Sequence, residues 1–382
     1  MTIRLYDKDV DMLDFSAVVK TCAQRENGYV VTLDQTAFFP EGGGQGADHG
    51  TLGGAQVLDA HDVHGEVEHL VSAPLAIGSE VRGHVDAARR LDMMQQHSGE
   101  HMFSGLVHGL FGYDNVGFHI GTEAVTMDFN GPLTEEDIRR VELLANQAVW
   151  RDQPVEAFVP GREALANIEY RSKKELEGQV RIVTIPGVDV CACCAPHVRR
   201  TGEVGGLKVM HVQNYKGGVR ISILCGFRAL DAFRQKTKTV DEMMGLLSSS
   251  EEELRSHIKR LQTENQNLAY ALRQAQEKIL AQEAKGLDAD AEDVVLFADA
   301  CDSKAMRSIV NDMVKDHAGY CAIFAGGDEQ GYQFIVGSRT KDCRQEAAHL
   351  RETFDAKGGG GTQMIQGSVR AAKVHLAENW MA

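Results

Sequence analysis

Two histidines four residues apart are the first residues in this sequence whose types and spacing suggest chemistry. They are His97 and His101, in the stretch QQHSGEHMFSGL. Four residues make about one turn of an α-helix, so on a helix both imidazoles project from one face and can reach one ion. The pair alone does not establish a metal site, because polar helix faces carry such pairs by chance.

A second pair of metal-ligand side chains follows in the stretch CCAPHVRRTGEVG, where three residues separate Cys193 from His197. One thiolate and three imidazoles together favour zinc among the common ions. Three cysteines crowd beside this histidine, and in a reducing compartment such a cluster indicates metal binding rather than disulfides. From the residues alone, either Cys191 or Cys194 can replace Cys193 as the ligand.

The stretch HSGEH also fits the H-x-x-E-H signature of inverted zinc peptidases, with Glu100 as general base. Three fixed residues in five positions occur easily by chance. This alternative also leaves the Cys193 and His197 pair, and the glycine-rich stretches of the chain, without a role. We therefore rank a peptidase well below a site built from all four residues.

A glycine triplet, Gly42 to Gly44, lies in the stretch FFPEGGGQGADHGTLGG, and Gln45 follows it directly. Glycines in a row permit unusual backbone angles or the close approach of another backbone or a ligand. A plain flexible hairpin is the structural alternative. The amide side chain at position 45 favours a binding loop.

The elements that must position these residues can be outlined from patterning. Residues 1–90 have the alternation and β-branched content of strands. Residues 87–112 are predicted to form one helix, followed by two strands within 115–130. Thr134 and Asp137 form a capping box at the start of a second helix. Residues 151–228 return to strands and loops, with a short helix predicted at 173–178.

Residues 232–285 differ, because they are predominantly helical and start with overlapping capping boxes such as Ser248 to Glu251. Their apolar residues follow a heptad pattern that predicts a two-stranded coiled coil, with Asn265 as its register-fixing polar residue. Antiparallel pairing within one chain is the alternative. The heptad positions are Leu254, Leu261 and Leu268 at d, and Ile258, Asn265, Leu272 and Ile279 at a. Residues 287–382 alternate strands and helices, which indicates an α/β layer with a glycine loop and a helical tail.

Length, composition and charge set broad limits. With 382 residues, 43% of them hydrophobic, the chain is expected to form two or three domains. No apolar run is long enough to span a bilayer, and the start lacks the pattern of a signal peptide, so a cytoplasmic protein is expected. The net charge of -15 argues mildly against a general nucleic-acid binder. Residues 151–230 nevertheless hold twelve Lys/Arg against eight Asp/Glu, a locally basic segment that suits a polyanion.

Together these motifs resemble the editing domain of alanyl-tRNA synthetases and, more closely, the free-standing AlaX-type editing proteins. The family pattern pairs H-x-x-x-H with a later C-x-x-x-H, followed by T-G-E-[IV]-G, which TGEVG matches. The family commonly has glycines between its Cys and His, where this chain has Cys194, Ala195 and Pro196. Its N-terminal signature, D-x-T-x-F-[FY]-P…G-G-Q-x-x-D-x-G, matches at Asp34, Thr36, Pro40, Gly43, Gly44, Gln45, Asp48 and Gly50.

The end of the chain, with KGGGGTQMIQG, resembles the C-terminal domain that alanyl-tRNA synthetases share with DHH-type phosphoesterases. The resemblance implies an α+β multidomain protein of the long AlaX type. Its parts would be an N-terminal β-barrel-like glycine-rich domain (1–90), an α/β zinc-containing editing domain (91–228), a helical coiled-coil linker (229–286) and a C-terminal α/β domain (287–382). No segment is left over for an aminoacylation domain.

The resemblance further implies a hydrolase that removes serine, or glycine, from mischarged tRNA for alanine. One zinc ion per chain would be held by His97, His101, Cys193 and His197. Gln45 would hydrogen-bond the carbonyl or the amino acid, the amides of Gly42, Gly43 and Gly44 would approach the substrate, and Thr36 is a hypothesised partner of the serine hydroxyl. The expected tRNA surface is the basic segment, with Arg171, Lys173, Lys174, Arg199, Arg200, Lys216 and Arg220.

Two further expectations concern assembly and the rival classes. A homodimer through the coiled coil and C-terminal domain is expected. The main rival is a non-catalytic tRNA-binding or oligomerisation module with a structural zinc, because a closed four-ligand set is normal for structural zinc. The sequence also does not exclude editing of D-aminoacyl-tRNA.

Overall fold

The computed structural model describes residues 1–172 and 179–381. Contacts divide the chain into two compact units, residues 1–240 and 241–382. The short helix predicted at 173–178 lies outside the described residues. Within the described residues, no helix is long and apolar enough to cross a membrane.

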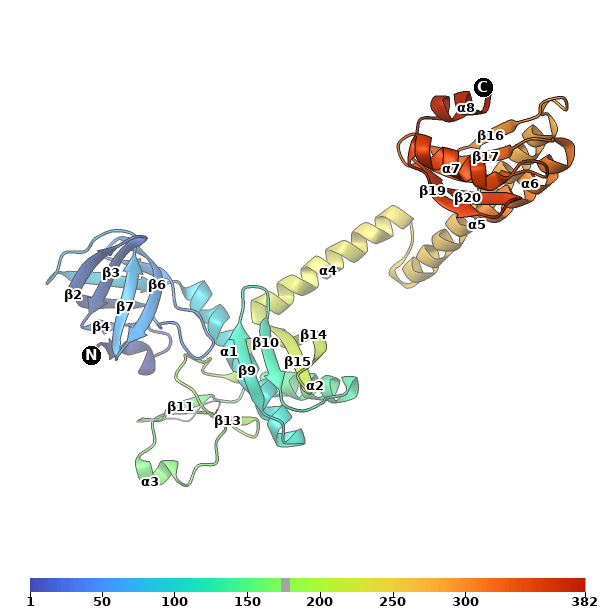
Figure 1. The fold of residues 1–382 in the computed structure, drawn as a ribbon. Helices are drawn as coiled ribbons and strands as arrows, with labels where there is room; N and C mark the ends of the chain where they lie inside the picture. Colours follow the sequence, from blue (N-terminus) through green and yellow to red (C-terminus); the bar gives the residue numbers. More distant parts are fainter. Residues whose placement is uncertain (173–178, 382) are drawn as a thin grey trace. The chain divides into compact units, whose positions relative to one another are not determined.

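The first unit begins with a closed β-barrel, drawn in blue in Figure 1. A short parallel pair, β1 (Ile3–Arg4) with β4 (Gln35–Thr36), and the 3-10 turn η1 (Leu5–Asp7) adjoin it. In barrel order the strands are β2 (Asp14–Arg25), β3 (Gly28–Leu33), β7 (Glu66–Val71), β6 (Ala55–Val63), β5 (Gly50–Leu52) and β8 (Glu80–Val85). Along strands such as β7 and β8 every second residue is buried, and these buried residues face the barrel interior.

The helix α1 (Ala87–Phe111) follows the last barrel strand directly and confirms the helix predicted for this region. Asp86 caps it, because its carboxylate accepts hydrogen bonds from the amides of Ala88 and Arg89. The helix ends at Gly112, which adopts the left-handed conformation. Residues 93–105 of α1 are buried without interruption, so this helix is central to the first unit rather than a surface element.

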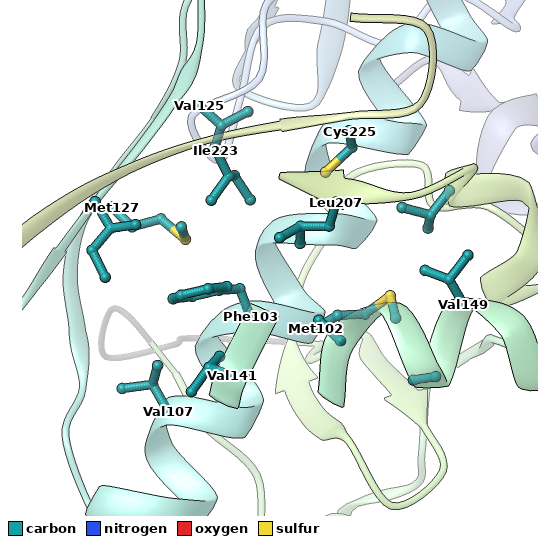
Figure 2. Close-up of a cluster of buried hydrophobic side chains, with 14 of the residues drawn as sticks. Met102, Phe103, Val107, Val125, Met127, Val141, Val149, Leu207, Ile223 and Cys225 are labelled. Atoms are coloured by element: carbon teal, nitrogen blue, oxygen red, sulfur yellow. The ribbon is translucent and has the colours of Figure 1, made fainter. Parts of the chain in front are cut away.

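An antiparallel four-stranded sheet packs on α1, in the order β14 (Leu207–Tyr215), β15 (Gly218–Cys225), β10 (Val125–Phe129) and β9 (Asn115–Ile120). The helix α2 (Glu135–Arg151) lies beside α1 and begins with the predicted Thr134 and Asp137 capping box. Figure 2 shows the core that these elements enclose, where Phe103 of α1 points toward residues of α2 and the sheet such as Val141 and Ile223. This core fixes the helix that carries His97 and His101.

A small three-stranded sheet supplies the second half of the candidate site. It consists of β11 (Glu156–Phe158), β12 (Ile182–Ile185) and β13 (Asp189–Ala192), with the short helices α3 (Arg162–Leu165) and η2 (Thr201–Val204) nearby in the chain. The start of β13 meets α1 at Gly105, where an added Cβ would lie 2.4 Å from the Val188 carbonyl oxygen. A glycine at this position therefore lets the helix approach Asp189 closely.

Two helices follow where one helical segment was expected. They are α4 (Gly226–Leu247) and α5 (Glu251–Lys285), separated at Ser248, which has a positive φ of 46°. Of the overlapping capping boxes predicted here, the one that starts α5 joins Ser250 to Glu253. Apolar heptad residues such as Leu268 and Leu272 are exposed, and the coiled coil itself stays a prediction.

The second unit contains a five-stranded sheet in the order β16 (Val294–Ala298), β17 (Cys321–Gly327), β18 (Gly331–Gly337), β20 (Met364–Val369) and β19 (Lys357–Gly360). Besides α5, it contains the helices α6 (Ser303–Asp316), α7 (Cys343–Phe354) and α8 (Lys373–Met381), the last being the predicted helical tail. The predicted glycine loop is wrong in one respect, because most of the run forms β19. Gly358 pairs with Gly367, and an added Cβ at Gly358 would lie 2.3 Å from the Gln366 carbonyl oxygen.

Candidate metal centre and its flanking loop

The structure brings the four predicted metal ligands together. His97 and His101 lie one turn apart on α1, and Cys193 and His197 lie on the loop that follows β13. One ligand atom from each residue lies within 4.8 Å of all the others. The Cys193 sulfur is 3.5 Å from His97 Nε2 and 3.4 Å from His197 Nε2. The three histidines are buried.

Each histidine of the cluster is held by its other ring nitrogen. His97 Nδ1 is 2.8 Å from Gln45 Oε1, and His101 Nδ1 is 2.9 Å from Asp189 Oδ2. His197 Nδ1 is 3.1 Å from the Ser98 hydroxyl. When these Nδ1 atoms carry the proton and donate it, each Nε2 presents a lone pair toward the cluster. This is the arrangement in which metal-binding histidines are usually fixed.

The electrostatics suit a thiolate at position 193. Burial alone would raise the pKa of the Cys193 thiol, but the imidazoles of His97 and His197 hold it well below its usual range. Burial lowers the pKa of His101, while the hydrogen bond to Asp189 outweighs this and raises it to about 9. Asp189 is in turn held by Arg171, whose Nε lies 2.7 Å from Asp189 Oδ1.

The donor set and its spacing fit a zinc ion. In a tetrahedral site, Zn–S and Zn–N distances of about 2.3 and 2.0–2.1 Å separate sulfur from nitrogen by about 3.6 Å. The two sulfur-to-nitrogen distances of 3.5 and 3.4 Å are close to that value. Among the three neighbouring cysteines the geometry favours Cys193, because Cys194 is exposed and Cys191 groups instead with His101 and Asp189.

The glycine-rich loop lies directly against the cluster. Gln45 is 1% exposed, and while its Oε1 is 2.8 Å from His97 Nδ1, its buried Nε2 has no hydrogen-bond partner within the described residues. Gly44 has a φ of +81°, and an added Cβ there would lie 2.6 Å from the Phe118 ring. Only glycine therefore fits between Gln45 and β9 without displacing Phe118.

A buried ion pair ties the end of this loop to α1. Arg90 contacts both carboxylate oxygens of Asp48 and also donates to the carbonyl oxygens of Val10 (2.7 Å) and Ala37 (2.6 Å). Asp48 accepts a further hydrogen bond from the Phe39 amide at 2.7 Å. Both side chains are almost fully buried. The pair thereby fixes the barrel and the glycine loop on the helix that carries the histidines.

Thr36 has a different set of neighbours from those of Gln45. Its hydroxyl is fully buried, lies 2.8 Å from His69 Nε2 and accepts a hydrogen bond from the Phe38 amide. His69 Nδ1 lies 3.1 Å from the Val31 carbonyl oxygen, to which it must donate. His69 Nε2 is then an acceptor, so the Thr36 hydroxyl donates to it. The contact predicted between Thr36 and a serine hydroxyl stays a hypothesis.

Among the described residues of the basic segment, four of the arginines proposed to meet tRNA form ion pairs with carboxylates of this chain. Arg199 contacts Asp9 and Asp11, Arg200 contacts Asp152, Arg171 contacts Asp189, and Arg220 contacts Asp128. These carboxylates offset the positive charges that were expected to meet phosphates. Lys216, at the β14–β15 turn, has no carboxylate partner within the described residues. Lys173 and Lys174 lie outside them.

Glu100, the general base of the alternative peptidase signature, is buried beside the cluster. Its Oε1 accepts hydrogen bonds of 2.6 Å from both Ser104 and Asn115, and Oε2 lies 3.9 Å from His101 Nε2. These contacts are typical of an enclosed structural carboxylate rather than one presented to a substrate. His108, seven residues after His101 on α1, lies 2.9 Å from Asp114 through its Nδ1 and is not part of the cluster.

Three residues that position the site were not identified from the sequence. Asp189 holds His101, Ser98 holds His197, and Arg90 anchors Asp48. Ser98 is adjacent to His97 but reaches His197, which is distant in the chain. No local pattern marks such a contact. For Asp189, its position two residues before the cysteine cluster could have indicated that it lies beside the metal site.

Comparisons with known proteins show similarity to alanyl-tRNA synthetases and to editing proteins. Residues 180–222, which include Cys193 and His197, match the family described as threonyl and alanyl tRNA synthetase second additional domain. The alanine–tRNA ligase of Ignicoccus hospitalis is 32% identical over 75% of this chain, and the one of Natronomonas pharaonis is 30% identical over 94%. The chain spans only 33% and 40% of the length of these two ligases.

Two relatives are matched over nearly their whole length. The alanyl-tRNA editing protein AlaX-L of Pyrococcus horikoshii is 26% identical over 97% of this chain and 95% of its own. The alanyl-tRNA editing protein Aarsd1 of Rattus norvegicus is 26% identical over 95% of this chain and 93% of its own. The chain is therefore a homologue of proteins named alanyl-tRNA editing protein, and the similarity extends over at least 95% of its length.

Proposed function

We propose that this protein hydrolyses the ester that joins a wrong amino acid, serine or glycine, to tRNA for alanine. Its homologues support alanyl-tRNA editing in general terms. The observation that carries the specific proposal is the juxtaposition of two features. The buried His97, His101, Cys193 and His197 cluster has metal-ligand spacing, and a glycine loop with unused hydrogen-bond donors lies against it.

In this proposal His97, His101, Cys193 and His197 hold one zinc ion. A bound zinc ion supplies Lewis acidity for an ester carbonyl and lowers the pKa of a bound water to about 7. Gln45, Asp189 and Ser98 orient the three imidazoles so that their Nε2 atoms converge. The chain's own contribution is thus a rigid donor set in a buried environment, where charges are screened little by water.

The loop residues supply hydrogen bonds to the substrate. The amides of Gly43 and Gly44 donate to no acceptor in the described part of the chain, and neither does Gln45 Nε2. Ester hydrolysis develops negative charge on the carbonyl oxygen, and preorganised amide donors stabilise such an oxyanion. We assign Gln45 two roles, since one amide atom holds His97 while the other remains to meet the substrate.

We hypothesise that Thr36 hydrogen-bonds the serine hydroxyl of the substrate and so discriminates against alanine, which has no hydroxyl. The Thr36 hydroxyl uses its proton on His69, so toward a substrate it would act as an acceptor only. A site that binds a hydroxyl can reject the analogue lacking it by ~10⁴-fold. If a Thr36→Val variant hydrolyses Ser-tRNA at the wild-type rate and still spares Ala-tRNA, Thr36 is a structural residue of the barrel.

The proposed partners are tRNA for alanine and a second copy of this chain, with the reaction placed in the cytoplasm. The heptad pattern of α5 supports the homodimer, because its apolar a and d residues are largely exposed in the single chain. Sedimentation equilibrium of the full chain tests this proposal. A monomer at micromolar concentrations would contradict it.

A matched pair of cysteine variants tests the metal-dependent function. Cys193→Ala removes a proposed ligand, whereas Cys194→Ala alters an adjacent, exposed cysteine. We expect Cys193→Ala to lose both bound zinc and deacylation of Ser-tRNA(Ala), and Cys194→Ala to retain both. Equal zinc content and equal activity in the two variants would exclude Cys193 as a ligand.

The second candidate function is a non-catalytic zinc module that binds tRNA. The observation in its favour is the complete four-residue donor set, which is normal for structural zinc. Folded, zinc-replete protein that binds tRNA(Ala) but releases no serine would favour this alternative. The unused donors of Gln45 and its loop are what the alternative leaves without a purpose.

A further inference from the structure

Arg181, beside the cluster, has no ion pair among the described residues, and its Nη1 donates to the carbonyl oxygens of Cys193 and Ala195. Arg89 lacks an ion pair too, but it lies against the glycine loop instead. It lies in the first turn of α1, and its Nε donates a 2.9 Å hydrogen bond to the Ala47 carbonyl oxygen of the glycine loop. Unlike Arg90, Arg171, Arg199 and Arg220, it forms no ion pair with any residue that the structure describes. Its two Nη groups are therefore cationic donors without a carboxylate.

Two carboxylates near Arg89 have other partners. Asp48 is paired with Arg90, and Asp86 accepts hydrogen bonds from the first amides of α1. The guanidinium lies against Gly46, where an added Cβ would be 3.3 Å from Arg89 Nη2. Gly46 therefore leaves the space next to this cation open. Arg89 is half-buried, so its charge is less hydrated than that of a fully exposed arginine.

The glycine loop connects this cation to the metal cluster. It runs beside α1, since Gln45 contacts His97, Ala47 contacts Arg89 and Asp48 contacts Arg90. Arg89 and His97 are eight residues apart on the helix, which is a rise of about 12 Å. A cation and the proposed ester site are thus joined by one short loop at a distance that suits adjacent parts of one extended substrate.

The loop between them adds further donors. Besides Gly43 and Gly44, the amides of Gly46 and Ala47 donate to no acceptor among the residues described. Gly43 and Gly44 both have positive φ angles, +61° and +81°. Successive free amides in such conformations form anion-binding concavities, and a guanidinium beside them provides charge-assisted hydrogen bonds. These features favour a phosphate at this position.

We propose that Arg89 binds a backbone phosphate at the 3′ end of the tRNA and so places the terminal ester at the metal cluster. This inference rests on the proposed editing function and names an anchor for its RNA substrate. The phosphate near the acceptor terminus occupies the space beside Gly46, with the amides of Gly46 and Ala47 and the Arg89 guanidinium as its donors, and the Gly43 and Gly44 amides are left for the ester.

The binding test uses the full-length protein and uncharged tRNA(Ala). We expect Arg89→Ala to weaken binding about tenfold at moderate salt, because one charge-assisted phosphate contact is lost. The slope of log K against log salt should fall by ~0.7, the value for one phosphate contact on a single strand. Arg89→Lys should keep the slope, since it keeps the charge. Arg25→Ala, at the exposed β2–β3 hairpin, is the matched control and should bind as the wild type does.

A kinetic test separates this inference from the proposed function. Arg89→Ala should raise KM for Ser-tRNA(Ala), keep kcat, and hydrolyse the 3′ seryl ester of adenosine, which has no phosphate, at the wild-type rate. Wild-type affinity and salt slope in Arg89→Ala, together with an active wild-type enzyme, would overturn the phosphate contact alone. A wild-type protein that hydrolyses neither substrate would overturn the editing function. Zinc content and far-UV circular dichroism of each variant confirm that it is folded.

Discussion

Replacing Gln45 with leucine should weaken zinc binding without removing any ligand. Gln45 Oε1 accepts the hydrogen bond of 2.8 Å that fixes the Nδ1 proton of His97. Leucine has a similar size but no acceptor, so the variant leaves a buried N–H group without a partner. Gln45 and His97 are each about 1% exposed, so water cannot readily replace the lost acceptor.

The size of the effect follows from two contributions. A lost hydrogen bond costs about 1 kcal/mol, and an unsatisfied buried donor costs about 1–3 kcal/mol. The ring can relieve part of this by tilting, so a net loss of about 1.5–3 kcal/mol in binding is reasonable. Zinc affinity should therefore fall by ~10–100-fold, the range found when outer-shell partners of metal ligands are removed.

Competition with a chromogenic zinc chelator measures this affinity directly. Gln96→Leu is the matched control, because Gln96 is fully buried on the same helix but bonds to Asp92 and to the backbone of Cys225. It should lower the free energy of unfolding and leave the zinc affinity of the folded protein unchanged. Wild-type zinc affinity in Gln45→Leu would refute the reasoning. If deacylation were lost at the same time, Gln45 would act on the substrate alone.

Three further outcomes are expected. Arg90→Met should lower the free energy of unfolding, measured with urea, by ~3–5 kcal/mol, because it leaves the Asp48 carboxylate buried without its cation; a loss below about 1 kcal/mol would contradict the buried pair. Burial lowers the pKa of His69 to about 4 in the folded barrel. Between pH 6.5 and pH 4, His69 is therefore protonated in the unfolded chain but neutral in the folded one. Stability should thus fall by about 3 kcal/mol from pH 7 to pH 4 relative to a His69→Gln variant, and parallel pH profiles would refute this. Glu100→Gln should change deacylation by less than about tenfold, whereas loss of a general base costs ~10²–10⁴-fold.

Patterns local in sequence predicted much of the fold and the four residues that the structure brings together as a candidate metal site. The i, i+4 spacing of His97 and His101 and the capping box at Thr134 depend only on helix geometry, so tertiary structure did not change them. The Cys193 and His197 pair was found from ligand chemistry and spacing. The choice among three cysteines needed coordinates, because only the path of the loop after β13 decides which sulfur faces the histidines.

Contacts between distant segments could not be predicted. The basic segment was judged from its own charges, but its arginines meet acidic residues elsewhere in the chain, such as Asp9 with Arg199 and Asp128 with Arg220. The bond between Thr36 and His69 likewise joins two strands through the barrel interior. The glycine run that forms β19 was read as a loop, since glycine disfavours strands unless close pairing, here with β20, requires it.

Deacylation of matched substrates tests the central claim most directly. The full-length protein would be incubated with Ser-tRNA, Gly-tRNA and Ala-tRNA, all on tRNA for alanine, before and after chelation and after zinc is restored. The proposed function predicts rapid loss of serine, or of glycine, with alanine retained, and an activity that disappears with the metal and returns with it. Folded protein with a full complement of zinc that leaves all three esters intact would contradict it.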